Sequence, residues 1–178
     1  WQGLSLADVN GDGLDDVYVC QPGGLPNRLF VQQQDGSALD VSATAGVDWW
    51  DHSHASLFVD LDGDADQDLV LATALGLIFM SNDGQGHFSV ESAKLCPEAM
   101  PFTIAAADYD QDGDLDIYAS CYSPRGNAIA TEFLARPVPY HDANNGGENH
   151  LLRNDGGFVF TDVTKDVGLD QHNTRFSF

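Results

Sequence analysis

Short apolar runs alternate with glycine- and aspartate-rich segments along the whole chain. The runs are rich in β-branched and aromatic side chains, as in Asp16-Val-Tyr-Val-Cys20 and Asp116-Ile-Tyr-Ala119. Their length and composition favour buried strands over helices. Turn signals occur at Gln34-Asp35-Gly36, Asn82-Asp83-Gly84 and Asn154-Asp155-Gly156, where tight connections between antiparallel strands are expected. The pattern predicts an all-β chain.

A repeated unit organises these strands. Each of three copies contains a ladder of aspartates, and the ladders begin at Asp8, Asp60 and Asp108. A second match supports the unit, because residues 27–48 align without a gap to residues 149–170. A period of ~40 to 50 residues is typical of the four-stranded blades of β-propellers. We therefore expect blades of four antiparallel strands, with each aspartate ladder in the loop between the first and second strands.

The repeat also predicts the organisation of the chain as a single, partial propeller. Blade 1 is expected at about 1–50, blade 2 at about 51–99 and blade 3 at about 100–170, with an insertion rich in proline and glycine at 122–148. Residues 171–178 are similar to the first strand of a fourth blade. Because closed rings have about four to eight blades, we expect a fragment, or blades that another chain completes.

The aspartate ladders have the spacing of calcium-binding loops. Oxygen-bearing side chains stand at positions one, three, five and nine, and a backbone carbonyl at position seven completes the set. Such oxygens are the ligands that Ca²⁺ prefers, so three Ca²⁺ sites are expected. The candidate ligands are Asp8, Asn10, Asp12, Leu14, Asp16, Asp60, Asp62, Asp64, Asp66, Asp68, Asp108, Asp110, Asp112, Asp114 and Asp116.

The three loops differ at position six, where the chain must turn back on the ion. This residue is Gly13 in the first loop and Gly113 in the third, but Ala65 in the second, whose glycine, Gly63, stands at position four. Glycine lacks the Cβ that restricts such a turn, so the second site is expected to be weaker or bent. No loop has an acid at position twelve, which excludes a helix-loop-helix calcium site.

Charge is concentrated in the ladders. The chain has 28 acidic and 7 basic residues, for a formal net charge of −21, and the ladders hold half of the acids. Three bound Ca²⁺ ions would leave a charge of −15, which still argues against nucleic acid or an anionic membrane as a partner. A hydrophobic content of 43% is enough for a folded core and argues against a disordered acidic tail.

The cysteines leave two interpretations open. The chain has Cys20, Cys96 and Cys121, and a disulfide between Cys96 and Cys121 is the more plausible single pairing, because Cys20 and Cys121 end equivalent strands of blades 1 and 3. Alternatively, all three are buried thiols that pack as small apolar side chains.

Histidines and tryptophans offer other candidate sites. His52 and His54 would point to the same side of a strand and could bind a metal, although no third ligand is identifiable, and a second histidine motif lies at 140–142. Alternatively, His52 and His54 belong to a polar connection between blades. Trp49 and Trp50 suit either a core or a platform that stacks on sugars.

Several motifs together carry a family resemblance. The aspartate loops, Asn-x-Leu, Asn-Asp-Gly-Gly-Phe and Asp-Val-Thr-x-x-x-Gly-Leu resemble the FG-GAP or VCBS repeats of integrin alpha-like propellers. They are most similar to the secreted ASPIC/UnbV, cartilage-acidic-protein-like family, in which residues 136–147 resemble a long inserted blade segment. The ASPIC/UnbV region itself is absent from this sequence. The resemblance implies a propeller in which the ladder residues bind Ca²⁺ for a structural purpose.

The functional expectation follows from the resemblance and the calcium loops. We expect a non-enzymatic, extracellular or cell-surface module for adhesion or recognition of a protein or glycan on a loop face, without membrane insertion. Extracellular calcium modules bind at ~10⁻⁴ to 10⁻³ M, which is too weak for the cytosol. Two alternatives remain: the propeller of a polysaccharide lyase or hydrolase, or a building block of a filament or surface layer that self-associates through open blade edges.

Overall fold

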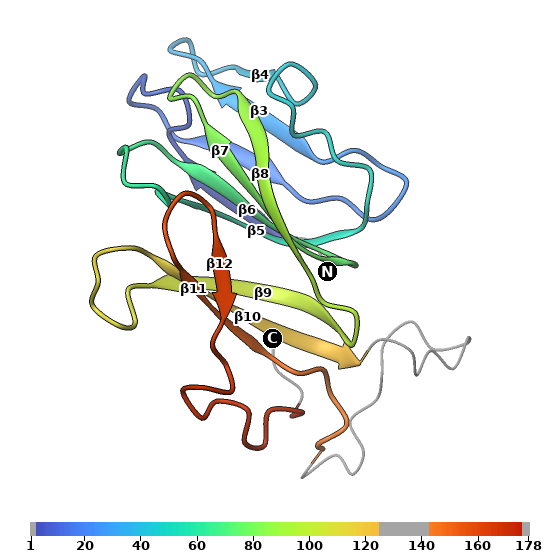
Figure 1. Ribbon diagram of the computed structural model, residues 1–178. Helices are drawn as coiled ribbons and strands as arrows, with labels where there is room; N and C mark the ends of the chain where they lie inside the picture. Colours follow the sequence, from blue (N-terminus) through green and yellow to red (C-terminus); the bar gives the residue numbers. More distant parts are fainter. Residues whose placement is uncertain (1–2, 125–142, 176–178) are drawn as a thin grey trace.

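A computed structural model describes residues 3–124 and 143–175 of the chain (Figure 1). These residues form β-strands, turns and loops, and no helix occurs among them. The fold is therefore all-β, as the short apolar runs predict. In the same residues, nothing has the length and hydropathy of a membrane-spanning helix.

Twelve strands form three separate sheets of four, and in each sheet the order in space follows the order in the sequence. All pairings are antiparallel, as expected for propeller blades. Blade 1 consists of β1 (Leu4–Ala7), β2 (Asp16–Val19), β3 (Arg28–Gln32) and β4 (Ala38–Asp40). Blade 2 consists of β5 (Ser53–Val59), β6 (Asp68–Thr73), β7 (Gly76–Asn82) and β8 (Phe88–Leu95). Blade 3 consists of β9 (Ala99–Ala107), β10 (Asp116–Pro124), β11 (His150–Asn154) and β12 (Phe160–Asp162).

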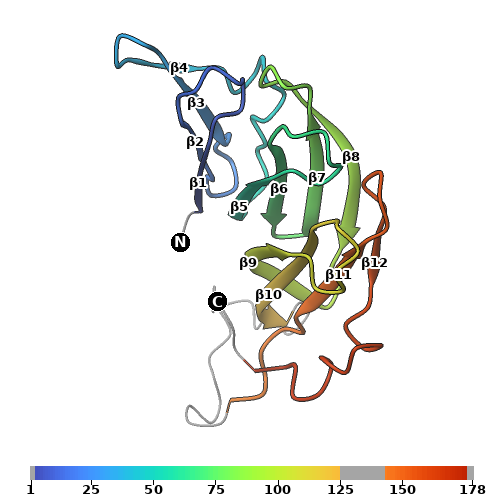
Figure 2. The same cartoon turned by 90° about the vertical axis from the view of Figure 1, so that its left-hand side faces the viewer.

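The blades lie side by side in an open array, with their first strands, β1, β5 and β9, along one side (Figure 2). The first strands are joined by polar contacts. The hydroxyl oxygens of Ser5 and Ser56 lie 2.8 Å apart across β1 and β5, and the Nδ1 atom of His54 lies 3.0 Å from the carbonyl oxygen of Pro101 across β5 and β9. Blade 2 therefore contacts blade 1 on one side and blade 3 on the other.

The hydrophobic core lies between the blades. All six residues of β6 are buried, because side chains alternate along a strand and both faces of blade 2 are covered. Leu69 and Leu71 belong to the cluster shared with blade 1, whereas Val70 and Ala72 belong to the cluster shared with blade 3. Burying apolar surface on both faces, at roughly 25 cal/mol per Å², holds the array together.

Aromatic side chains fill both interfaces. Tyr18 of blade 1 meets Phe58 of blade 2 edge to face, with ring centroids 6.2 Å apart. The Tyr18 hydroxyl donates a hydrogen bond to the carbonyl oxygen of Val47 at 2.9 Å, so the buried ring keeps its polar group satisfied. Between blades 2 and 3, Phe79 and Phe160 stack with centroids 4.0 Å apart.

The outer face of blade 1 is exposed, whereas residues after β12 cover part of the outer face of blade 3, where Leu151 is 7% exposed. On blade 1, Leu4 and Leu6 are 59% and 58% exposed. On blade 3, Tyr118 and Leu151 pair across β10 and β11, on the face opposite the shared core. They line an apolar hollow of about 380 Å³.

Two segments differ from the boundaries expected from the sequence. Strand β10 continues to Pro124, so it extends three residues into the range 122–148 that was expected to be an insertion, and its pairing with β9 is irregular around Cys121. Of the remaining insertion, residues 125–142 lie outside the described part of the chain. Residues 171–175, expected to begin a fourth blade, form turns, and 176–178 also lie outside the description.

Candidate functional site

The three aspartate ladders occupy the loops between β1 and β2, β5 and β6, and β9 and β10. These are the expected loops between the first and second strands of each blade. All three lie on the same side of the array in Figure 1. We call them loop 1 (residues 8–16), loop 2 (60–68) and loop 3 (108–116).

The aspartate at position nine fixes each loop to its own sheet. Asp16, Asp68 and Asp116 begin the second strands and are at most 1% exposed. One carboxylate oxygen accepts the N–H of the loop's second residue, with distances of 3.0, 2.8 and 2.9 Å from Val9, Leu61 and Tyr109. The other accepts the N–H at the end of the third strand, at 2.9, 3.0 and 2.9 Å from Gln32, Asn82 and Asn154. These two hydrogen bonds fix the orientation of the aspartate relative to its sheet.

The aspartate at position one closes the loop from the other end. Its Oδ2 accepts the N–H of the residue at position six, at 2.7 Å from Gly13, 3.0 Å from Ala65 and 3.2 Å from Gly113. In addition, each N–H at position seven donates to the carboxylate at position five of the same loop. The loops thus curl around their own carboxylates.

Two residues of every loop adopt a left-handed backbone. At position four, φ is 71° for Gly11, 80° for Gly63 and 65° for Gln111. At position six, φ is 85° for Gly13, 75° for Ala65 and 102° for Gly113. Loop 2 therefore shares the left-handed positions of the other loops, although Oδ1 of Asp60 accepts the N–H of Gly63 at position four, where loops 1 and 3 use the N–H at position five. The expectation that its site is weaker or bent stays a prediction. Ala65 adopts the left-handed conformation that glycine adopts at position six of the other two loops. Gln111 adopts the same kind of conformation at position four of loop 3, so both residues carry backbone strain.

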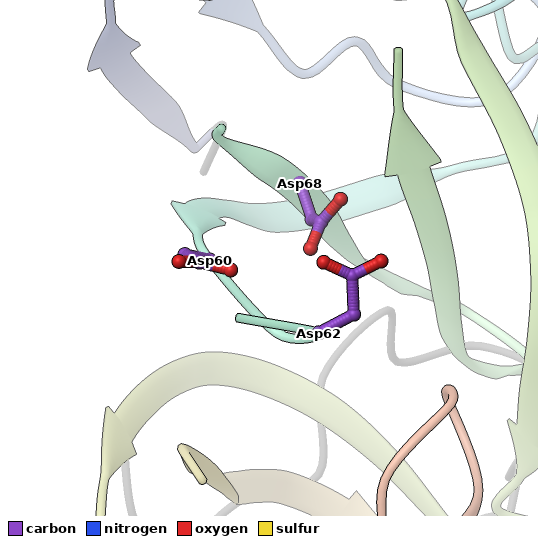
Figure 3. Close-up of side chains that lie close together, drawn as sticks. All are labelled: Asp60, Asp62 and Asp68. Atoms are coloured by element: carbon purple, nitrogen blue, oxygen red, sulfur yellow. The ribbon is translucent and has the colours of Figure 1, made fainter. Parts of the chain in front are cut away.

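Two of the loops bring three carboxylates together in a group that could hold a metal ion. In loop 2 the group is Asp60, Asp62 and Asp68, and Figure 3 shows Asp62 and Asp68 facing each other across the loop. In loop 3 it is Asp108, Asp110 and Asp116. Within each group, ligand atoms lie within 4.8 Å of one another.

Loop 1 and the remaining predicted ligands are arranged differently. Position three of loop 1 is Asn10, whose amide stands where loops 2 and 3 have a carboxylate, and its Nδ2 donates to Asp12 at 3.3 Å. The fifth-position carboxylates Asp64 and Asp112 lie outside the two groups and accept backbone N–H groups instead. Positions one, three and nine therefore form the centre of the candidate sites in loops 2 and 3.

Crowding and burial raise the pKa values of loop carboxylates. Burial raises the pKa of Asp68 to about 6, and nearby carboxylates add to the effect. The pKa of Asp66 is likewise raised to about 6 by burial and by Asp64. Burial and neighbouring aspartates also raise the pKa values of Asp16, Asp62 and Asp110. Like charges this close disfavour ionisation, and a divalent cation would remove that penalty.

The donor set fits such a cation. Every side-chain ligand candidate is a carboxylate or an amide that offers oxygen, which suits Ca²⁺ and not a thiolate- or imidazole-preferring metal. In loop 2 the Oδ1 atom of Asp66 is buried and has no hydrogen-bond partner among the described residues. A buried oxygen without a partner normally costs free energy, so this position also favours a bound cation.

The cysteines form no disulfide in the structure. Cys20, Cys96 and Cys121 are all buried, and none is joined to another through sulfur. The pairing of Cys96 with Cys121 that the sequence suggested is therefore not present, and the alternative of buried thiols describes the fold. Burial raises the pKa of Cys20 to about 11 and that of Cys121 to about 12.

Most of the described histidine and tryptophan candidates lie at contacts between blades, but Trp50 is exposed. The His52 and His54 rings are 4.5 Å apart, and His54 also stacks on Phe102 at 5.0 Å. Neither histidine belongs to a metal-binding group among the described residues, and the motif at 140–142 lies outside them. Trp49 packs against the core between blades 1 and 2, whereas Trp50 is 62% exposed.

Sequence reasoning missed the role of Asn82 and Asn154. Both were interpreted as turn residues, yet both are buried and their side-chain amides reach the preceding blade. Asn82 donates to the carbonyl oxygen of Val9 at 2.8 Å, and Asn154 donates to that of Leu61 at 2.8 Å. The available signal was that each asparagine ends an apolar run at the same place in its repeat.

The open array of four-stranded sheets, with an aspartate loop in each, defines a class of β-repeat proteins with an acidic loop in every repeat. A family model described as FG-GAP-like repeat matches residues 8–71 and 60–119, which together cover more than half of the chain. The chain therefore belongs to the FG-GAP-like repeat family. The matched segments contain all three loops and end at residue 119, within β10.

Similarity to cartilage acidic protein 1 agrees with the resemblance that the motifs indicated. Cartilage acidic protein 1 from Mus musculus is 28% identical over 123 residues, which are 66% of this chain and 19% of that protein. Cartilage acidic protein 1 from Xenopus tropicalis is 24% identical over 131 residues, which are 70% of this chain and 20% of the relative. The chain thus spans about a fifth of the length of these relatives. The resemblance inferred from the motifs is confirmed.

Proposed function

We propose that this FG-GAP-like repeat module binds Ca²⁺ in its three aspartate loops and uses the ions to stabilise its fold. The observation that carries this proposal is the gathering of three carboxylates within 4.8 Å in loop 2 and again in loop 3. Loop 1 has the same backbone conformation and hydrogen bonds. It offers an amide oxygen from Asn10 in place of one carboxylate, which Ca²⁺ also accepts.

The role of the ions would be structural. The ninth-position aspartates begin central strands of the blades and are fixed by backbone N–H groups. An ion at the loop would therefore be connected directly to the sheet. It would also offset the burial and the repulsion between carboxylates that together raise the pKa values of Asp62, Asp66 and Asp68. The bound ions would rigidify the face on which the loops lie.

We further propose that the module acts outside the cytoplasm in adhesion or recognition of a protein or glycan, without catalysis. Calcium loops of ~10⁻⁴ to 10⁻³ M affinity are filled only at extracellular calcium concentrations. The similarity to cartilage acidic protein 1 supports this assignment. Deleting residues 125–142 tests whether the insertion contacts the partner, since surface binding should fall while calcium-dependent unfolding stays the same. Unchanged binding would remove the insertion from the proposal.

Thermal unfolding in CaCl₂, in EDTA and in MgCl₂ tests calcium binding. A site filled at 100 times its Kd adds about 2.7 kcal/mol of stability, and each kcal/mol raises the Tm of a domain of this size by about 2 to 4 °C. We expect a large increase in Tm in CaCl₂ and a much smaller one in MgCl₂, which prefers a smaller octahedral site. Equal shifts in both salts would indicate charge screening, and no shift would overturn the proposal.

Loop variants provide the matched control for this experiment. Replacing Asp60 and Asp62 by asparagine should reduce the calcium-dependent part of the stabilisation, because it removes two carboxylates of one group. Replacing Asp35 and Asp83 by asparagine makes the same change in net charge at exposed turn residues outside the loops. That control variant should keep the full calcium response.

A further inference from the structure

A continuous series of hydrogen bonds connects the three aspartate loops. Asn82 is its first bridge, because its side-chain NH₂ group donates to Val9 of loop 1 at 2.8 Å and to Gln67 of loop 2 at 3.2 Å. Asn154 repeats the arrangement one blade further, with Leu61 of loop 2 at 2.8 Å and Leu115 of loop 3 at 3.3 Å. In each case one amide group holds two neighbouring loops by their backbone carbonyls.

The same bridges reach the candidate ligands. The backbone N–H of Asn154 donates to Oδ1 of Asp116 in loop 3. Leu61 accepts a hydrogen bond from the Asn154 side chain through its carbonyl oxygen. The backbone N–H of Leu61 also donates to Oδ2 of Asp68 in loop 2. Asn154 therefore contacts the central carboxylate of loop 3 directly and reaches that of loop 2 through one residue, Leu61. Asn82 has the equivalent contacts with Asp68, and through Val9 with Asp16.

The second residue of a loop is also packed into the interface with the following blade. Val9 is 1% exposed and lies in the cluster between blades 1 and 2. Leu61 is 2% exposed and lies in the cluster between blades 2 and 3, with Ile117 and Leu152. An ordered loop therefore presents both a side chain and a carbonyl to the next blade. If the loop loosens, the next blade loses a core contact and the asparagine loses an acceptor.

We propose that Asn82 and Asn154 couple the calcium sites of adjacent blades, so that filling one loop raises the affinity of the next. This inference rests on the proposed calcium binding. Ordering loop 2 fixes the Leu61 carbonyl, which positions the Asn154 side chain, whose backbone N–H orients Asp116 of loop 3. Coupling free energies between sites are reciprocal, so loop 3 acts on loop 2 through the same contacts.

Blade 1 provides an internal control position. Gln32 ends β3 as Asn82 ends β7 and Asn154 ends β11, and its N–H donates to Asp16 at 2.9 Å in the same way. Gln32 is exposed, because no described blade precedes it. Its side chain makes no contact with another loop in the described part of the chain. Gln32→Ala therefore changes the same position of the repeat without removing a bridge.

Terbium luminescence can report on loop 3 alone. Tb³⁺ binds oxygen sites in place of Ca²⁺, and Tyr109, the second residue of loop 3, interacts electrostatically with the candidate ligands Asp110 and Asp116, so it is expected to sensitise the ion. The signal from a Tyr109→Phe variant gives the background to subtract. Loop 2 is disabled by replacing Asp62 and Asp64 with asparagine. The Tb³⁺ affinity of loop 3 is then measured in four proteins: the parent and Asn154→Ala, each with loop 2 intact and with loop 2 disabled.

In the parent, disabling loop 2 should weaken Tb³⁺ binding at loop 3 by at least about 5-fold, the lower end of usual coupling between sites. In Asn154→Ala the same change should alter the affinity by less than about 2-fold, as for independent sites. Gln32→Ala should behave as the parent does. Asn154→Asp provides a second variant, because it keeps an acceptor for the N–H of Gly156 and cannot donate to Leu61.

Two results would overturn the coupling. One is an equal weakening in the parent and in Asn154→Ala, which would indicate an electrostatic effect through space. The other is no weakening in the parent. Both differ from a failure of calcium binding itself, in which no variant shows Tyr109-dependent luminescence and calcium does not change the Tm. Circular dichroism establishes that each variant is folded before titration.

Discussion

Ala65 and Gly13 occupy the same position of two aspartate loops and share a left-handed backbone, with φ of 75° and 85°. A left-handed conformation costs a residue with a Cβ roughly 1 to 2 kcal/mol. Ala65→Gly should therefore stabilise the protein by about 1 kcal/mol, which corresponds to about 2 to 4 °C in Tm. Thermal unfolding in calcium measures the change.

Gly13→Ala is the reciprocal variant. No atom lies within 4 Å of a Cβ built at Gly13, so the substitution should cost only the backbone strain, again about 1 kcal/mol. A destabilising Ala65→Gly, or a neutral Gly13→Ala, would contradict the equivalence of the two loops.

Asp68 should be difficult to replace even by its isosteric amide. Both of its carboxylate oxygens accept backbone N–H groups, from Leu61 and Asn82, and the residue is fully buried. Asp68→Asn places an NH₂ group against one of these donors and leaves it unsatisfied, at a cost of about 1 to 3 kcal/mol. Urea unfolding in calcium should show this loss.

Asp15→Asn is the control for the change of charge at Asp68. Asp15 belongs to the same type of loop but is exposed, so its replacement should alter the free energy of unfolding by less than about 0.5 kcal/mol. Similar losses in the two variants would mean that net charge, and not the buried hydrogen bonds, determines the effect.

His54 should make the stability depend on pH. Burial lowers its pKa to about 4, whereas a histidine in the unfolded chain titrates near 6.5. As the pH falls from 6.5 toward 4, the unfolded chain takes up a proton that the folded chain does not. The contribution of His54 to stability is therefore lost over this range, by up to about 1.4 kcal/mol per pH unit.

Urea unfolding in EDTA at several pH values, with His54→Gln for comparison, measures this dependence. Asp66 and Asp68 act in the opposite sense, because their raised pKa values let the folded chain bind protons below pH 6. Their contribution is common to both proteins and cancels in the difference. The parent should lose more stability than His54→Gln on acidification, and parallel curves would contradict the prediction.

The cysteines should react only after unfolding. All three are buried, and burial raises the pKa values of Cys20 and Cys121 to about 11 and about 12, so little thiolate is present near pH 8. Thiol titration without reductant should detect almost no reaction in calcium and three thiols in denaturant. One thiol in denaturant would instead indicate the disulfide between Cys96 and Cys121.

The sequence predicted the strands and loops because both depend on local patterns. A short apolar run identifies a strand, and oxygen side chains at alternate positions identify a loop such as Asp60 to Asp68. The left-handed backbone at Gln111 and Ala65 could not be predicted, since only the loop as a whole imposes it on residues that disfavour it. The position of Gly63, interpreted as a departure, proved to be the position that Gly11 occupies in loop 1.

The contacts between blades were beyond prediction for a different reason. Asn82 lies 73 residues from its acceptor Val9, and an Asn-Asp-Gly sequence already accounts for the residue as part of a turn. Only the packing of one blade on the next shows that its side chain points to the preceding loop. The same applies to Trp49 and Trp50, which are adjacent in sequence but differ in burial.

The two faces of a blade are chemically distinct, and this gives the array a direction. In blade 2, Leu69 and Leu71 pack in the cluster that contains Tyr18 of blade 1, while Val70 and Ala72 pack in the cluster that contains Ile117 of blade 3. The two faces of a blade therefore cannot be exchanged, and the blades follow one another in a single orientation. The side chains at the two junctions differ, with Tyr18 and Phe58 at the first and Phe79 and Phe160 at the second, so each blade is fitted to its own place in the array.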